Sequence, residues 1–241
     1  MQEINLTLKS KKPDGNHEIK GVSALFLGSI GTIAETSVLQ LEAFNRAFVN
    51  FNIGWRWSEE EYTQMLKQAG GRRRIKDYAA KKNLVLSEAE IIEIHQCKTD
   101  IFSELLVTRE IKAREGVPEI IKNCAEKNIK LGWVTTTSDQ NVKAIKDATS
   151  NQIDFSLFST IITEDDVKNP KPAPDSYLKA LQKLGIDAGE AVAVEDSNSG
   201  VSSAKSASVI CIAVPGEYGY LQDFTYADIS LSDLHCLTLS H

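Results

Sequence analysis

Paired cysteines are missing from this sequence. Its four cysteines lie far apart, and no two of them have the C-x-x-C spacing of a metal knuckle or a redox pair. This spacing argues against a structural metal site and against a disulfide framework. We therefore expect free thiols in a reducing compartment, either the cytoplasm or a reducing organelle lumen.

Long apolar runs and an excess of positive charge are also absent. No run approaches the roughly 20 apolar residues that cross a bilayer, and the first twelve residues contain no apolar core of a signal peptide. The net charge of -6 disfavours extended contact with nucleic acid or a membrane surface. What remains is a 241-residue chain with 42% hydrophobic residues, which is enough for one core and a smaller lid.

Segments with strand character alternate with helical segments over most of the chain. A short strand at residues 4–8 and a turn at 12–16 precede a buried strand at 21–27. Further strands are predicted at 129–134, 159–163, 191–194, 209–214 and 227–231. This alternation predicts the α/β class, with a doubly wound parallel sheet whose ligands bind at the carboxyl ends of the strands.

Residues 37–108 interrupt this alternation with helical patterns alone. Ser58 and Ser87 each begin a capping box, and the pair Gly70-Gly71 is expected to end the helix that starts after Ser58. Pro118 stands where a later helix would begin. We expect an inserted helical cap domain at 37–108, and an α/β core made of residues 1–36 and 109–241.

Polar residues follow three of the predicted strands. Thr135 follows the strand at 129–134, Lys171 follows the strand at 159–163, and Glu195 with Asp196 follows the strand at 191–194. Hydroxyl groups and helix N-termini hold phosphate oxygens, lysine neutralises phosphate charge, and carboxylates hold Mg²⁺. Together and in this order, these residue types indicate phosphoryl chemistry.

The motifs around these residues, K-P-x-P-D-x-Y from Lys171 and E-D-S-x-x-G from Glu195, resemble those of the haloacid dehalogenase (HAD) superfamily. Its β-phosphoglucomutase and CbbY-like branch is the most similar part. Three further segments resemble patterns of that branch: Gly70–Ile75 its G-G-K-x-R-I, His95–Thr99 its H-x-x-K-T, and Arg114–Val117 its R-P-G-V. Two positions differ, because Arg72 replaces the lysine and Glu115 replaces the proline. The resemblance covers roughly residues 22–232.

The resemblance implies a HAD-like Rossmannoid core, a helical cap and Mg²⁺-dependent hydrolysis of sugar phosphates. It assigns phosphate binding to Thr135 and Lys171, and a metal site to Asp196 with weaker help from Glu195. The substrate-binding residues that it implies are Glu35, Arg72, Arg74 and Arg114.

The catalytic aspartates of this family are missing. Its first motif is D-x-D-G-T-L, but this chain has Gly28 at the nucleophile position and Ile30 at the acid/base position. No carboxylate lies between Glu18 and Glu35, so a shift of register cannot restore either group. Loss of a nucleophile costs on the order of 10⁶ in kcat in another hydrolase.

Three functions follow as alternatives. The first is a pseudophosphatase, with Mg²⁺ weakly bound or absent, that still binds a sugar phosphate or inorganic phosphate. The second is a structural or interaction protein with a vestigial pocket, whose protein partner the sequence does not reveal. The third is a phosphatase with relocated chemistry, using a carboxylate such as Glu35 or Asp166.

Overall fold

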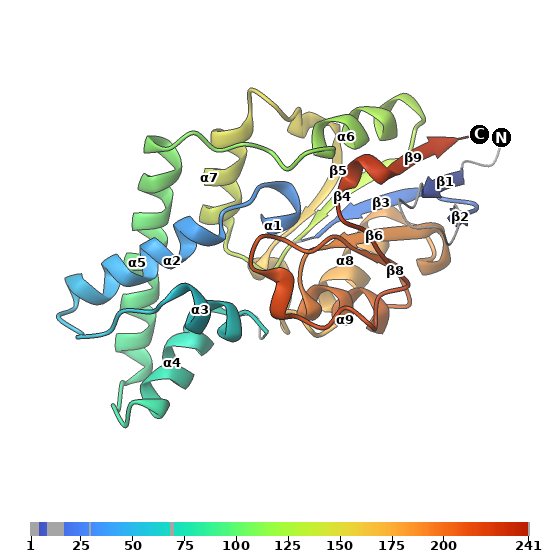
Figure 1. Ribbon diagram of the computed structural model, residues 1–241. Helices are drawn as coiled ribbons and strands as arrows, with labels where there is room; N and C mark the ends of the chain where they lie inside the picture. Colours follow the sequence, from blue (N-terminus) through green and yellow to red (C-terminus); the bar gives the residue numbers. More distant parts are fainter. Residues whose placement is uncertain (1–4, 9–16, 29, 68–69, 241) are drawn as a thin grey trace.

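A parallel six-stranded sheet forms the centre of the computed structural model, which describes residues 5–8, 17–28, 30–67 and 70–240. The strand order is β5-β4-β3-β6-β7-β8 (Figure 1). The strands are β3 (Ala24–Leu27), β4 (Lys130–Val134), β5 (Phe158–Ile162), β6 (Ala191–Glu195), β7 (Ile210–Ala213) and β8 (Ile229–Ser230). The predicted parallel sheet is therefore confirmed.

Helices cover both faces of this sheet, because its strands are apolar on both sides. In β3, Leu25 and Leu27 belong to one apolar cluster, whereas Ala24 and Phe26 belong to another. Helices α6 (Val117–Glu126) and α7 (Asp139–Thr149) pack into the first cluster. Helices α8 (Asp175–Leu184) and α9 (Asn198–Ser206) pack into the second. The fold is thus doubly wound, and Pro118 stands in the first turn of α6 as expected.

A second, antiparallel sheet joins the two ends of the described chain. It has the order β2-β1-β9 and consists of β1 (Asn5–Leu8), β2 (His17–Ile19) and β9 (Leu237–Ser240). The sequence predicts the first strand but not its pairing with the C-terminal strand. The turn expected at residues 12–16 lies outside the described residues.

Four helices lie to one side of the parallel sheet, at the left of Figure 1. They are α2 (Ser37–Asn50), α3 (Glu59–Met65), α4 (Gly71–Lys81) and α5 (Glu88–Thr108). Ser58 and Ser87 form the two expected capping boxes. All four helices fall within residues 37–108, and we propose that they constitute the cap.

The expected role of Gly70-Gly71 is wrong. Helix α3 already ends at Met65, and the two glycines instead open α4, with Gly70 at a φ of 104°. A Cβ on Gly71 would lie 3.4 Å from the Phe44 ring and would overlap the imidazole of His95. Glycine is needed here because the start of α4 lies so close to α2 and α5.

Short helical segments complete the chain. Helix α1 (Ile30–Ile33) follows β3 directly. The 3₁₀ segments are η1 (Phe155–Leu157), η2 (Glu164–Asp166), η3 (Ala188–Glu190), η4 (Gly219–Leu221) and η5 (Leu234–Cys236). The four cysteines are free, as predicted. None of the described helices combines the length and the apolar character needed to cross a membrane.

Candidate functional site

A cavity of about 490 Å³ lies between the carboxyl ends of the sheet strands and the helices α2 to α5. The sheet side contributes residues that follow β3, β4, β5 and β6, because parallel strands place all these ends at one edge. Among its lining residues are the arginines Arg72, Arg73 and Arg74, the lysines Lys98 and Lys171, and the carboxylates Glu164 and Asp196. This surplus of positive charge suits an anionic ligand.

Thr135 and Lys171 both line this cavity, as the prediction of a phosphate site requires. Thr135 directly follows β4, and its Oγ1 accepts the backbone N–H of Thr137 at 3.2 Å. Ser138 caps α7, whose N-terminus therefore begins at the cavity. Phosphate binding by Thr135 and Lys171 stays a prediction, now with both residues on one wall.

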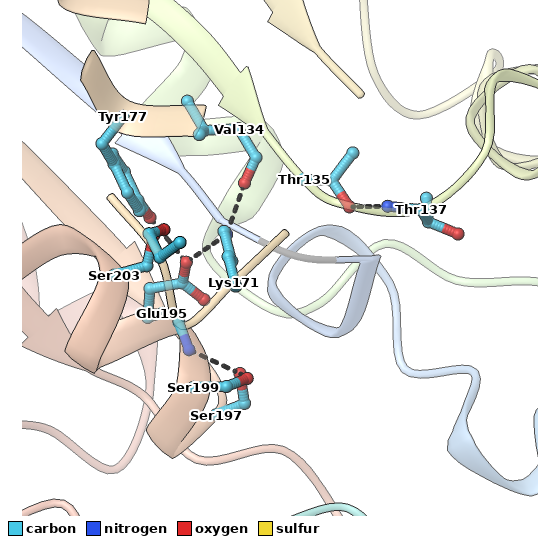
Figure 2. A network of polar contacts seen from close by, with 11 residues as sticks. Val134, Thr135, Thr137, Lys171, Tyr177, Glu195, Ser197, Ser199 and Ser203 are labelled. Atoms are coloured by element: carbon cyan, nitrogen blue, oxygen red, sulfur yellow. Dashed lines mark hydrogen bonds and ion pairs between the residues drawn. The ribbon is translucent and has the colours of Figure 1, made fainter. Parts of the chain in front are cut away.

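Lys171 is part of a buried polar network (Figure 2). Its Nζ donates to the carbonyl of Val134 at 2.6 Å and lies 2.5 Å from Oε1 of Glu195. The hydroxyl of Tyr177 donates to the same Oε1 at 2.5 Å. Burial, and then the neighbouring Glu195 carboxylate, raise the pKa of Tyr177 well above its usual value, so the phenol stays a donor.

Glu195 lies in the space beside Gly28. A Cβ built on Gly28 would stand 2.6 Å from Oε1 of Glu195 and still closer to the other two carboxyl atoms. A Cβ built on Gly200, in α9, would also stand 2.6 Å from Oε1 of Glu195 and closer to the other two carboxyl atoms. The Glu195 carboxylate is therefore enclosed between two glycines, one of which stands at the nucleophile position of the family.

Ile30 lines the cavity at the acid/base position, with 8% of its surface exposed. It begins α1 and presents an apolar side chain where the family has an aspartate. Ser29, the alternative residue after a shift of register, lies outside the described residues. Neither Gly28 nor Ile30 offers a nucleophile or a proton-transferring group.

The carboxylates near the cavity make a poor magnesium site. Asp196 lines the cavity. Glu195 is not among the lining residues, is fully buried and forms an ion pair with Lys171. Oε2 of Glu195 lacks a hydrogen-bond partner, but it faces Gly28 and Gly200. Over the part of the chain that the structure describes, no three His, Cys, Asp or Glu side chains gather as metal ligands. The residues do not fit a tightly held Mg²⁺ ion, which requires near-octahedral oxygen ligands.

Arg72 and Arg74 line the cavity from α4. The guanidinium carbon of Arg74 lies 5.7 Å from the ring centroid of Tyr62 and 5.9 Å from that of Phe44. Such stacking fixes the orientation of a planar guanidinium. These two arginines form a cationic wall opposite the ends of the sheet strands.

Glu35 and Arg114, by contrast, are not among the residues that line the cavity. Glu35 accepts backbone N–H groups of Ser37 at 3.0 Å and Glu217 at 2.7 Å. Arg114 donates to the carbonyls of Gly31, Val214 and Pro215 at 2.9–3.0 Å. Both side chains bind backbone groups of segments beside the cavity, and their expected substrate contact stays a prediction.

Asp166 also lies away from the cavity lining. Its carboxylate accepts the N–H of Thr163 and pairs with Lys183. These donors lower its pKa against the opposing effect of burial.

Sequence reasoning missed several lining residues on the helices. Lys98 and His95 lie on α5 within the H-x-x-K-T segment, and Gln40 lies on α2. Burial, aided by the nearby cations Lys98, Arg72 and Arg74, lowers the pKa of His95 to about 3, so this imidazole is neutral. The motif itself was the available signal, because its spacing places His95 and Lys98 on one helix face.

The family model for haloacid dehalogenase-like hydrolases matches residues 31–214. Protein CbbY of Rhodobacter capsulatus is 34% identical over 213 residues, which cover 88% of this chain and 94% of the relative. A crystal structure of CbbY from Rhodobacter sphaeroides in complex with phosphate has a TM-score of 0.82 at 35% identity. It covers 88% of this chain and 95% of that one.

A crystal structure of a CbbY variant from the same organism, in complex with xylulose-(1,5)bisphosphate, has the same TM-score, identity and coverage. The resemblance to the CbbY-like branch is thereby confirmed, and this chain belongs to the haloacid dehalogenase-like hydrolase family.

Proposed function

We propose that this protein is a catalytically inactive CbbY-type phosphatase that still binds a sugar bisphosphate. The observation that carries the proposal is the position of Glu195. Its carboxylate fills the space beside Gly28 in which the nucleophile of the family would begin. The chain therefore lacks the reacting group and also holds a buried ion pair in its place.

Glu195 is itself a poor replacement nucleophile. Its Oε1 takes hydrogen bonds from Lys171 and Tyr177, which draw electron density from the carboxylate. It does not line the cavity, and neither do Glu35 and Asp166, the carboxylates considered for relocated chemistry. The positions of these three carboxylates favour an inactive protein over a phosphatase with relocated catalytic residues.

Binding is supported at both ends of the cavity. On the sheet side, Thr135, the N-terminus of α7 and Lys171 provide donors for one phosphate. On the other side, Arg72 and Arg74 provide guanidinium groups for a second phosphate. A CbbY variant takes xylulose-(1,5)bisphosphate, and a sugar of this class is the ligand we propose here.

Isothermal titration with xylulose-1,5-bisphosphate, without Mg²⁺, tests the proposal. We expect the wild type to bind, and Arg72→Gln or Thr135→Val to bind about tenfold or more weakly, since hydrogen bonds to charged groups contribute about 1.5–3 kcal/mol. Arg56→Gln, an exposed arginine outside the cavity lining, is the matched control and should bind like the wild type.

The same protein with Mg²⁺ present should release no inorganic phosphate above the rate of a protein-free sample. An absence of binding in the wild type would leave the pocket vestigial and would favour an interaction protein. Phosphate release by the wild type would refute inactivity.

A further inference from the structure

Lys98 is a buried lysine in the cavity wall that the proposed function does not use. It lies on α5 with only 3% of its surface exposed. Its Nζ donates to Oε1 of Gln40 and lies 5.0 Å and 4.9 Å from the ring centroids of Phe44 and Phe102. The amine is thus held in place, at the cavity, in a largely apolar environment.

Unlike Lys171, Lys98 has no carboxylate partner in the described part of the chain. Nζ of Lys171 is instead held by two acceptors, the carboxylate of Glu195 at 2.5 Å and the carbonyl of Val134 at 2.6 Å. The charged group that acts on Lys98 is a cation instead, Arg74 of α4, and His95 of the same helix is neutral.

Burial, followed by the charge of Arg74, lowers the pKa of Lys98 from 10.5 to about 7. A large part of the side chain is therefore a free amine at neutral pH. Desolvation and a neighbouring cation are the two influences that convert lysine into a nucleophile in enzymes that form Schiff bases.

We propose that Lys98 condenses reversibly with the carbonyl group of a ketose phosphate held in this cavity, forming an imine. The inference rests on the proposed function, which supplies a sugar phosphate to the cavity, and narrows the ligand class to sugars with a free carbonyl. With the phosphates at the two proposed ends, the carbon chain lies between them, in the cavity that Lys98 also lines.

The condensation is balanced without a co-reactant. The lone pair of Nζ forms a bond to the carbonyl carbon, and the carbonyl oxygen takes up a proton as the nitrogen releases one. The resulting carbinolamine loses its hydroxyl as water, and the carbon–nitrogen double bond forms. Nothing is oxidised or reduced, and Phe44 and Phe102 limit the return of water to the imine.

Borohydride trapping tests this inference on the full chain. Xylulose-1,5-bisphosphate is the probe, and sodium borohydride reduces any imine to a stable secondary amine. Intact mass spectrometry should show a single adduct, with the mass of the probe less one oxygen atom, and peptide mapping should place it on Lys98. An adduct on Lys171 or on exposed lysines, or none at all, would overturn the proposal.

Two variants sharpen the result. Lys98→Arg keeps a long basic side chain but cannot form an imine, and should reduce the adduct at least about tenfold. Lys143→Arg, an exposed lysine on α7, should leave it unchanged. The wild-type yield should also rise as the pH passes about 7. An adduct yield in Lys98→Arg equal to that of the wild type would contradict the proposal. So would a wild-type yield that does not change with pH.

The pentitol bisphosphate obtained by reducing the probe separates this inference from the proposed function. It carries both phosphates but no carbonyl. If it binds by calorimetry while the ketose gives no adduct, the imine proposal fails and the proposed function stands. If neither sugar binds, the proposed function fails, and with it the imine proposal.

Discussion

Nζ of Lys171 and Oε1 of Glu195 lie 2.5 Å apart, with 3% and 0% of their side chains exposed. Removing one partner of such a pair leaves a buried charge without compensation, which costs about 3–5 kcal/mol. We expect Lys171→Met to lower the free energy of unfolding by this amount in urea denaturation. The double variant Lys171→Met, Glu195→Gln should recover a large part of it.

Lys122→Met is the control for that experiment, because Lys122 forms only an exposed ion pair with Glu126. Its effect should stay within about 1 kcal/mol. Equal stability of Lys171→Met and Lys122→Met would show that the buried pair does not hold the site together.

Gly28→Ala should destabilise the protein. The added methyl group would overlap the Glu195 carboxylate, which is itself fixed by Lys171 and Tyr177. Overpacking of this kind costs about 1–3 kcal/mol, measured by urea or thermal denaturation. At Gly189 a Cβ has nothing within 4 Å, so Gly189→Ala should be nearly neutral. A neutral Gly28→Ala would mean that Glu195 does not occupy this space.

Acid should destabilise the fold in part through His95. Its pKa is about 3 in the folded protein against 6.5 as the ordinary value, mainly because the imidazole is buried. As pH falls from 6.5 towards 3, the unfolded chain takes up a proton that the folded protein does not, so stability declines. Urea titrations across this range should show a shallower decline for His95→Gln. Parallel curves would contradict the assigned shift.

Arg114→Met should weaken the fold more than it weakens ligand binding. Its guanidinium satisfies the carbonyls of Gly31, Val214 and Pro215, and unsatisfied buried carbonyls cost about 1–3 kcal/mol. Arg109→Met, which removes only an exposed arginine near Glu42, is the matched control. A large loss of bisphosphate affinity in Arg114→Met, with unchanged stability, would instead support the substrate contact expected from the sequence.

The arrangement of the sheet side was predictable because parallel strands bring their carboxyl ends to one edge. Thr135, Lys171 and Asp196 are distant in sequence, yet all three line one cavity for this reason. The loss of the family's aspartates at Gly28 and Ile30 was also predictable, because no carboxylate lies between Glu18 and Glu35 in any register.

Contacts between distant segments were not predictable. Glu195, at the end of β6, fills the space beside Gly28, which follows the neighbouring strand β3. No local sequence pattern predicts this contact. Likewise, the surroundings of the Lys98 amine are formed in part by Gln40 and Phe44, which lie on another helix, α2. The pairing of β1 with β9 depends on the two ends of the described chain meeting, which the local sequence does not encode.

One measurement tests the central claim most directly. Phosphorus-31 NMR follows xylulose-1,5-bisphosphate mixed with stoichiometric protein, first without and then with Mg²⁺. The account predicts that the phosphorus signals shift or broaden on binding and that no inorganic phosphate signal grows. Mg²⁺-dependent growth of inorganic phosphate, abolished in a Thr135→Val or Lys171→Met variant, would contradict it.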